Sequence, residues 1–157
     1  MAGMVSHVAT SGCIAILTDR LPVGLPEKIM IAVGGSLISH FVLDAIPHGE
    51  MKGGMTIEFF IGLPVYLFLA ALSYLVKGIE AAMIFCVSGF AGMIPDGLLF
   101  LTRYCPQNGG AKFLIRQNKK NHWFLKVWPR DWMFGWLYHF SMATFSIVIF
   151  LIALFLL

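Results

Sequence analysis

Long, uninterrupted apolar stretches dominate the pattern of hydrophobic and polar positions along this chain. Crossing the hydrocarbon core of a bilayer takes about 20 mainly apolar residues of helix. Four stretches meet this requirement: residues 28–47, 57–76, 81–102 and 132–157. They do not alternate between apolar and polar positions, as the strands of a membrane barrel would. The pattern therefore predicts helices that span a membrane.

The N-terminal stretch 2–19 is a weaker, fifth candidate span, because Ser6, His7, Thr10 and Ser11 dilute its apolar character. A signal peptide is the alternative interpretation, but no basic segment precedes the apolar residues, as such a peptide requires. We therefore predict an all-α, polytopic membrane protein with about five transmembrane helices. A basic amphipathic segment would lie between the fourth and the fifth helix.

Composition agrees with a membrane protein and excludes other classes. Apolar residues make up 59% of the chain and charged residues only 12%, with a mean hydropathy of +0.83. Soluble domains carry about a quarter charged residues, and disordered chains are far less apolar. At 157 residues the chain has room for a single transmembrane domain, residues 1–157, without a soluble catalytic module. The three cysteines form no CxxC pair, so they indicate neither a disulfide framework nor a zinc ribbon.

Positive charge is concentrated between the fourth and fifth predicted spans. Residues 103–131 hold seven of the eleven Lys and Arg residues and one acid, Asp131. The positive-inside rule therefore predicts a multi-pass protein of the cell membrane whose N-terminus and loop 103–131 are cytoplasmic. Aromatic and aliphatic residues interleave with these cations, which suits a helix lying on anionic lipid. Nucleic-acid binding is the less favoured alternative, because topology alone explains the charge.

Ionisable residues inside the predicted spans are the strongest functional signal, since each costs at least about 2.5–3.5 kcal/mol at the centre of a membrane helix. They are His7, His40, Asp44, Asp96 and His139. Under the predicted topology all of them lie within roughly 10 Å of the cytoplasmic face, at 1.5 Å per helical residue. Polar residues with unrelated structural roles would have no reason to share a depth.

His40 and Asp44 are four residues apart, so a helix places both on one face. An imidazole nitrogen and a carboxylate oxygen so arranged can bind zinc, manganese or iron. A His–Asp hydrogen bond that staples two helices without metal is equally compatible with the pair. The sequences AIPHG (45–49) and MIPDG (93–97) share the pattern Ile-Pro-x-Gly. Pro and Gly explain why a helix would end at these positions, but they do not explain the intervening His48 and Asp96.

The remaining candidates have simpler alternatives. His122 lies beside Trp123 in the basic loop, where histidines are commonly interfacial residues. Glu58, at the edge of the third span, is a candidate water-activating base. His139 lies among aromatic residues and is expected to be a core histidine. The predicted metal ligands are therefore His7, His40, Asp44, His48, Asp96 and His122, with Glu58 as the catalytic residue.

In these residues the chain resembles the YdjM-like inner-membrane metal-dependent hydrolases. The matching elements are the early His7, the S-H-x-x-x-D of Ser39–Asp44, the P-D of Pro95–Asp96 and His122 in the basic loop. The resemblance implies a compact helical membrane protein with a divalent-metal site. Here S-H-x-x-x-D precedes the P-D element, the reverse of the family order. Gly-Leu-Leu also follows Asp96, in place of the family's x-D-H.

Three functions remain open at the level of the sequence. The first is a hydrolase that uses a divalent metal, zinc or manganese, at the cytoplasmic face and acts on an anionic lipid or phosphoester. The second is a non-enzymatic membrane protein with a structural metal or hydrogen-bonded cluster and a lipid- or partner-binding loop. A metal or proton transporter is less favoured, because the polar residues gather at one face and residues 147–157 contain none.

Overall fold

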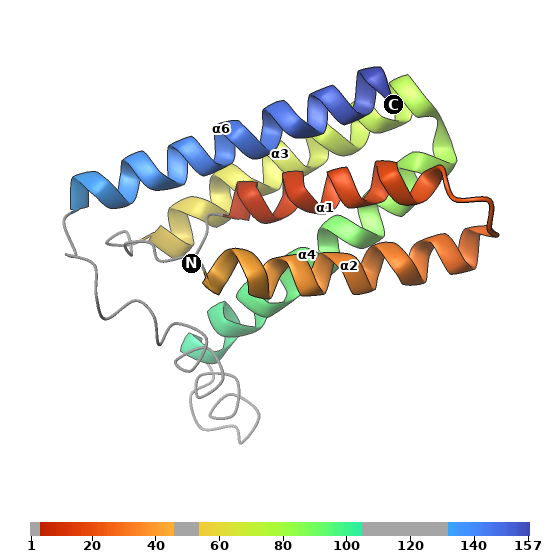
Figure 1. Ribbon diagram of the computed structural model, residues 1–157. Helices are drawn as coiled ribbons and strands as arrows, with labels where there is room; N and C mark the ends of the chain where they lie inside the picture. Colours follow the sequence, from red (N-terminus) through yellow and green to blue (C-terminus); the bar gives the residue numbers. More distant parts are fainter. Residues whose placement is uncertain (1–3, 46–53, 105–131) are drawn as a thin grey trace.

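The computed structural model describes residues 4–45, 54–104 and 132–157 (Figure 1). Within these residues every regular element is an α-helix: α1 (Met4–Asp19), α2 (Leu25–Ala45), α3 (Gly54–Lys77), α4 (Ile79–Tyr104) and α6 (Trp132–Leu156). Each helix matches the stretch that the sequence predicted, with ends displaced by at most three residues. The interpretation of MIPDG (93–97) as a helix end is wrong, because α4 continues through Pro95 to Tyr104. The all-α class is confirmed, and the basic segment 105–131 lies outside the described residues.

Three of the described helices are long and apolar enough to cross a membrane. The qualifying stretches are Phe60–Lys77 in α3, Ile79–Leu98 in α4 and His139–Leu156 in α6. Large apolar side chains on these helices face outward, including Phe60, Leu75 and Phe140 at 70–77% exposure. Such a surface suits lipid and not water. The chain is therefore a polytopic membrane protein, while full crossing by α1 and α2 stays a prediction.

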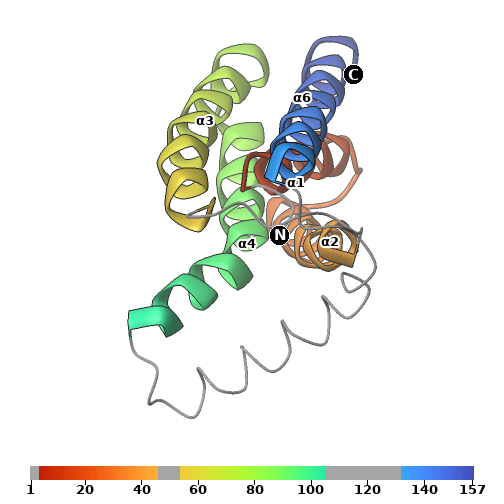
Figure 2. The same ribbon diagram turned by 90° about the vertical axis from the view of Figure 1, so that its left-hand side faces the viewer.

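The weakest predicted span, α1, is the central helix of the bundle. It contacts α2, α3, α4 and α6, and lies between α6, α4 and α2 when the bundle is seen from its end (Figure 2). Most of its buried positions carry small side chains, among them Ser6, Ala9, Ser11, Gly12 and Ala15. Small residues let neighbouring helices approach closely in a membrane. The low hydropathy of α1 thus reflects contact with protein rather than with lipid.

A layer of aromatic rings fills the bundle beside Gly12. Phe85 of α4 and Phe150 of α6 are fully buried, and their ring centroids lie 5.6 Å apart at an angle of 60°. Tyr66 of α3 stacks on Phe85 at 5.8 Å, and its hydroxyl donates a 2.7 Å hydrogen bond to the carbonyl of Cys86. This layer joins α3, α4 and α6 around the middle of α1.

Lys28 ties three helices together at one end of the bundle. Its Nζ lies 3.4 Å from Asp19 Oδ1 at the end of α1 and 2.9 Å from Glu80 Oε1 in the first turn of α4. Nearby, Gly78 alone separates α3 from α4, with a φ of +90° that disfavours any residue with a Cβ. Because a single residue joins them, α3 and α4 are adjacent and antiparallel.

We predict that Gly12→Ala destabilises the bundle, because a Cβ at this position would lie 2.6 Å from the rings of both Phe85 and Phe150. Overpacking of this kind typically costs about 1–3 kcal/mol. Gly34→Ala in α2 is the matched control, since its Cβ would meet nothing within 4 Å and should stabilise the helix by about 0.5–1 kcal/mol. Thermal unfolding in detergent measures both changes. Equal effects at the two positions would contradict this packing of α1.

Candidate metal centre

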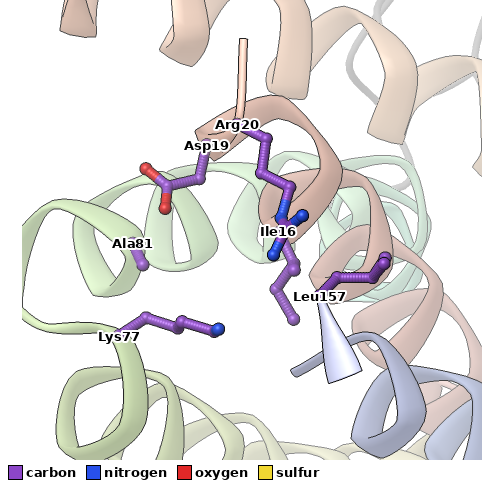
Figure 3. Close-up of a pocket in the computed structure, with 6 residues that line it drawn as sticks. All are labelled: Ile16, Asp19, Arg20, Lys77, Ala81 and Leu157. Carbon is purple, nitrogen blue, oxygen red and sulfur yellow. The ribbon is translucent and has the colours of Figure 1, made fainter. Parts of the chain in front are cut away.

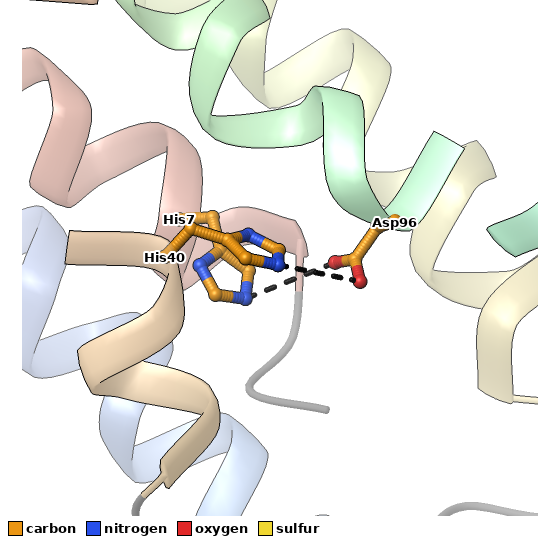
Figure 4. A group of neighbouring side chains, drawn as sticks. All are labelled: His7, His40 and Asp96. Carbon is orange, nitrogen blue, oxygen red and sulfur yellow. Dashed lines mark ion pairs between the residues drawn. The ribbon is translucent and has the colours of Figure 1, made fainter. Parts of the chain in front are cut away.

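Three of the predicted ligands meet at the opposite end of the bundle from Lys28. His7 comes from α1, His40 from α2 and Asp96 from α4, and Figure 4 shows both rings directed toward the carboxylate. His7 Nε2 lies 3.8 Å from Asp96 Oδ2, and His40 Nε2 lies 3.9 Å from Asp96 Oδ1. One ligand atom from each residue lies within 4.8 Å of the other two. The group is therefore compact enough to hold one metal ion.

The spacing within this group fits ligands of a shared ion better than direct hydrogen bonds. Nitrogen–oxygen hydrogen bonds are typically about 2.7–3.2 Å long, shorter than both His–Asp separations. Two ligand atoms that are each about 2.0–2.2 Å from one zinc ion can lie up to about 4.4 Å apart. Both His–Asp distances fall below that limit, so ligation requires only a small inward movement of the side chains.

The backbone of α4 fixes which nitrogen of His40 faces the carboxylate. His40 Nδ1 lies 2.8 Å from the carbonyl oxygen of Gly92, in a buried contact. A carbonyl only accepts, so Nδ1 carries the proton in the neutral ring, which leaves the lone pair on Nε2. Histidines that bind metals characteristically donate their second N–H to a carbonyl or carboxylate in this way. The hydrogen bond therefore prepares Nε2 of His40 as a ligand atom.

The two imidazole rings stack on each other. Their centroids are 4.1 Å apart, and their planes differ by 28°. Two imidazolium cations at this distance, away from water, would repel each other strongly. Metal ligation uses neutral imidazoles, so this close stacking is compatible with two ligands of one ion.

Burial differs among the three side chains. His7 and His40 are only 1% and 2% exposed, whereas Asp96 is 12% exposed. The imidazole rings are enclosed by the bundle, and the carboxylate lies at the accessible side of the group. A molecule that reaches this group from outside therefore approaches along the Asp96 side of α4.

The close packing of α1 and α4 brings His7 beside Asp96. One turn from each of these residues, Ser11 and Gly92 face each other, and a Cβ on Gly92 would collide with the Ser11 hydroxyl oxygen. One turn further along α4, Ser88 Oγ donates a 3.2 Å hydrogen bond to the Ser11 carbonyl. Sequence reasoning missed Gly92 as both a packing position and a partner of His40. The small-residue run S-G-F-A-G at 88–92 is the signal that could have indicated it.

The structure does not describe the side chains of the other predicted site residues. Asp44 lies in α2 one turn beyond His40, and Glu58 lies near the start of α3, but their side chains are outside the described residues. His48 and His122 fall entirely outside the described part of the chain. His139 is described: it is 6% exposed in α6, as expected for a core histidine, and is not among the three grouped ligands.

Comparison of the chain with family models, with curated protein sequences and with solved structures found no match in any of the three.

A double-mutant cycle tests the contact between α1 and α4. Gly92→Ala should destabilise the protein by about 1–3 kcal/mol, because its Cβ collides with Ser11 Oγ. Ser11→Ala should be nearly neutral, since Ser11 Oγ has no hydrogen-bond partner among the described residues. The double variant should recover most of the loss, because the two Cβ atoms would then be at an ordinary 3.5 Å. Unfolding of the four proteins measures the coupling, and additive losses would contradict the contact.

Proposed function

We propose that this protein is a membrane-embedded, metal-dependent hydrolase. The observation that carries the proposal is the convergence of His7, His40 and Asp96 from three helices at the spacing of a single-ion site. Two imidazoles and one carboxylate, with further coordination positions open, form the donor set of catalytic zinc sites. The same donors also suit manganese.

A divalent ion bound here would supply Lewis acidity and an activated water for attack on a phosphoryl or acyl group. The protein's own residues provide the remaining functions. Gly92 orients His40 through its carbonyl, and the tight bundle keeps water away from both imidazole rings. Glu58 is our candidate for the base that accepts a proton from the attacking water.

The substrate class follows from the charge near this end of the bundle. The basic segment 103–131 begins in the last turn of α4, where Arg103 is seven residues beyond Asp96. Its cations would attract an anionic lipid or a lipid-linked phosphoester to the membrane surface. We infer that the reaction takes place at the cytoplasmic face of the cell membrane, an inner membrane by resemblance to the YdjM-like hydrolases. Asp44, His48 and His122 are proposed as further ligands.

A non-enzymatic role is the second candidate. The hydrogen bond between His40 and Gly92 and the stacking of His7 on His40 would join α1, α2 and α4 with or without a metal. In that case the cluster stabilises the fold, and the basic loop alone binds lipid or a partner.

Metal analysis tests the site on which the hydrolase proposal rests, and the activity test below separates a catalytic metal from a structural one. Protein purified in detergent should hold about one equivalent of zinc or manganese by mass spectrometry, and His40→Ala and Asp96→Asn should lose it. His139→Ala is the matched control, because His139 is also a buried histidine but is not in the group. Chelation should lower the melting temperature of the wild type, and adding metal back should restore it. A wild type that is metal-free and insensitive to both treatments would support the non-enzymatic cluster.

Activity requires a separate test with phosphate-containing lipids in mixed micelles. We predict that Asp96→Asn abolishes hydrolysis together with metal binding. Glu58→Gln should lower kcat by about 10²–10⁴-fold while leaving the metal content unchanged, as expected on loss of a general base. If Glu58→Gln hydrolyses the lipid at the wild-type rate, Glu58 is not the general base, whether or not the metal site is confirmed.

A further inference from the structure

A pocket lies at the end of the bundle away from the metal site. It occupies about 240 Å³ and is lined by Ile16, Asp19, Arg20, Lys77, Ala81 and Leu157 (Figure 3). These residues come from the end of α1, the end of α3, the start of α4 and the end of α6. Asp19 is twelve residues beyond His7, so the two sites are about 18 Å apart along α1.

Two cations converge on this pocket. Figure 3 shows the side chains of Arg20 and Lys77 reaching toward its centre from different walls. Within the described part of the chain, neither side chain makes an ion pair or a hydrogen bond. Their charges are therefore available to a ligand.

The carboxylates near the pocket are already engaged. Asp19 and Glu80 share Lys28, whose Nζ lies 3.4 Å from the first and 2.9 Å from the second. The cations Arg20, Lys28 and Lys77 outnumber these two carboxylates by one. Lys28 thus offsets much of the repulsion that Asp19 would exert on an anion in the pocket.

Apolar surface continues from the pocket onto the outside of the bundle. The side chains of Ile16, Ala81 and Leu157 form its apolar walls. Next to them, Val76 of α3 is 37% exposed and Leu156 of α6 is 77% exposed. Both helices are long and apolar enough to cross a membrane, and both end here, where the headgroups of that membrane would lie. A ligand with a negative headgroup and hydrocarbon chains would contact both the cations of the pocket and the apolar surface beside it.

We propose that this pocket binds the phosphate group of an anionic phospholipid, in the leaflet at this end of the bundle. The Arg20 guanidinium is suited to hold two phosphate oxygens at once, and the Lys77 ammonium adds a second charge-assisted contact. The acyl chains lie along the exposed faces of α3 and α6. The bound lipid ties the ends of α1, α3 and α6 together and takes no part in the hydrolysis proposed above.

Lipid-dependent stability provides the test. Purified protein in a neutral detergent is titrated with phosphatidic acid, with phosphatidylcholine and with inorganic phosphate, and the melting temperature is followed. We expect phosphatidic acid to raise the melting temperature by several degrees, with little effect from the other two. Arg20→Gln/Lys77→Gln should raise the lipid concentration needed by at least about tenfold, as expected for two cations near a membrane surface.

The control variant is Lys52→Glu, which lowers the net charge by the same two units at a residue outside the basic segment 103–131 and not among the described residues that line the pocket. It should respond to phosphatidic acid like the wild type. His40→Ala should also respond like the wild type, which separates this proposal from the proposed metal site. Should the Arg20/Lys77 double variant not be obtained folded, Arg20→Gln and Lys77→Gln singly should each weaken the response about threefold.

Three results would overturn the proposal. An equal loss of response in Arg20→Gln/Lys77→Gln and in Lys52→Glu would show that overall charge attracts the lipid. Equal stabilisation by inorganic phosphate would indicate a site for a free anion and not for a lipid. A wild type unaffected by phosphatidic acid would show that the pocket does not hold this headgroup.

Discussion

The close approach of α4 to α1 at Gly92 and Ser11 is the contact on which the candidate metal centre depends. Without a side chain at Gly92, the two helices meet where any Cβ would collide with the Ser11 hydroxyl. His7 and Asp96 lie one turn away on the same two helices, so this contact places their side chains 3.8 Å apart. The carbonyl of Gly92 then accepts a hydrogen bond from Nδ1 of His40, which adds α2 to the group. One glycine thereby positions ligands from three helices.

The same contact explains how the bundle tolerates ionisable residues at buried positions. An isolated histidine or aspartate in the hydrocarbon core is costly, and its cost falls when polar groups face one another instead of lipid. Here the residues lie on α1, the helix enclosed by the others, or on the faces of α2 and α4 that contact α1. The outward faces of the described helices carry large apolar residues such as Ile38, Phe68 and Phe140. The polar group is therefore inside the protein while the surface remains suited to lipid.

Much of this architecture could be predicted from the sequence, because span length and charge are local properties. The apolar stretches gave the helices within a few residues, and the shared depth of His7, His40 and Asp96 indicated their grouping. The central position of α1 could not be predicted, since low hydropathy alone does not distinguish a buried helix from a poor span. Gly92 was missed for a related reason: the small-residue run 88–92 indicates close helix packing, but it does not show which helix approaches or which side chain bonds to the Gly92 carbonyl.

The two ends of the bundle carry different functional groups. The layer of core side chains between them bears on whether ions could pass through the bundle. One end holds the imidazole and carboxylate ligands, and the other holds Arg20 and Lys77 beside a small pocket. Between them the described core is filled by Phe85, Phe150, Leu69 and Ile84, all at most 1% exposed. A path for ions or protons needs polar groups or water across this layer. Among the described residues, Phe85 and Phe150 pack closely against Gly12, and the buried polar side chains beside them, such as Ser11 and Ser88, carry no charge. This packing favours chemistry at one membrane face over passage of ions through the bundle.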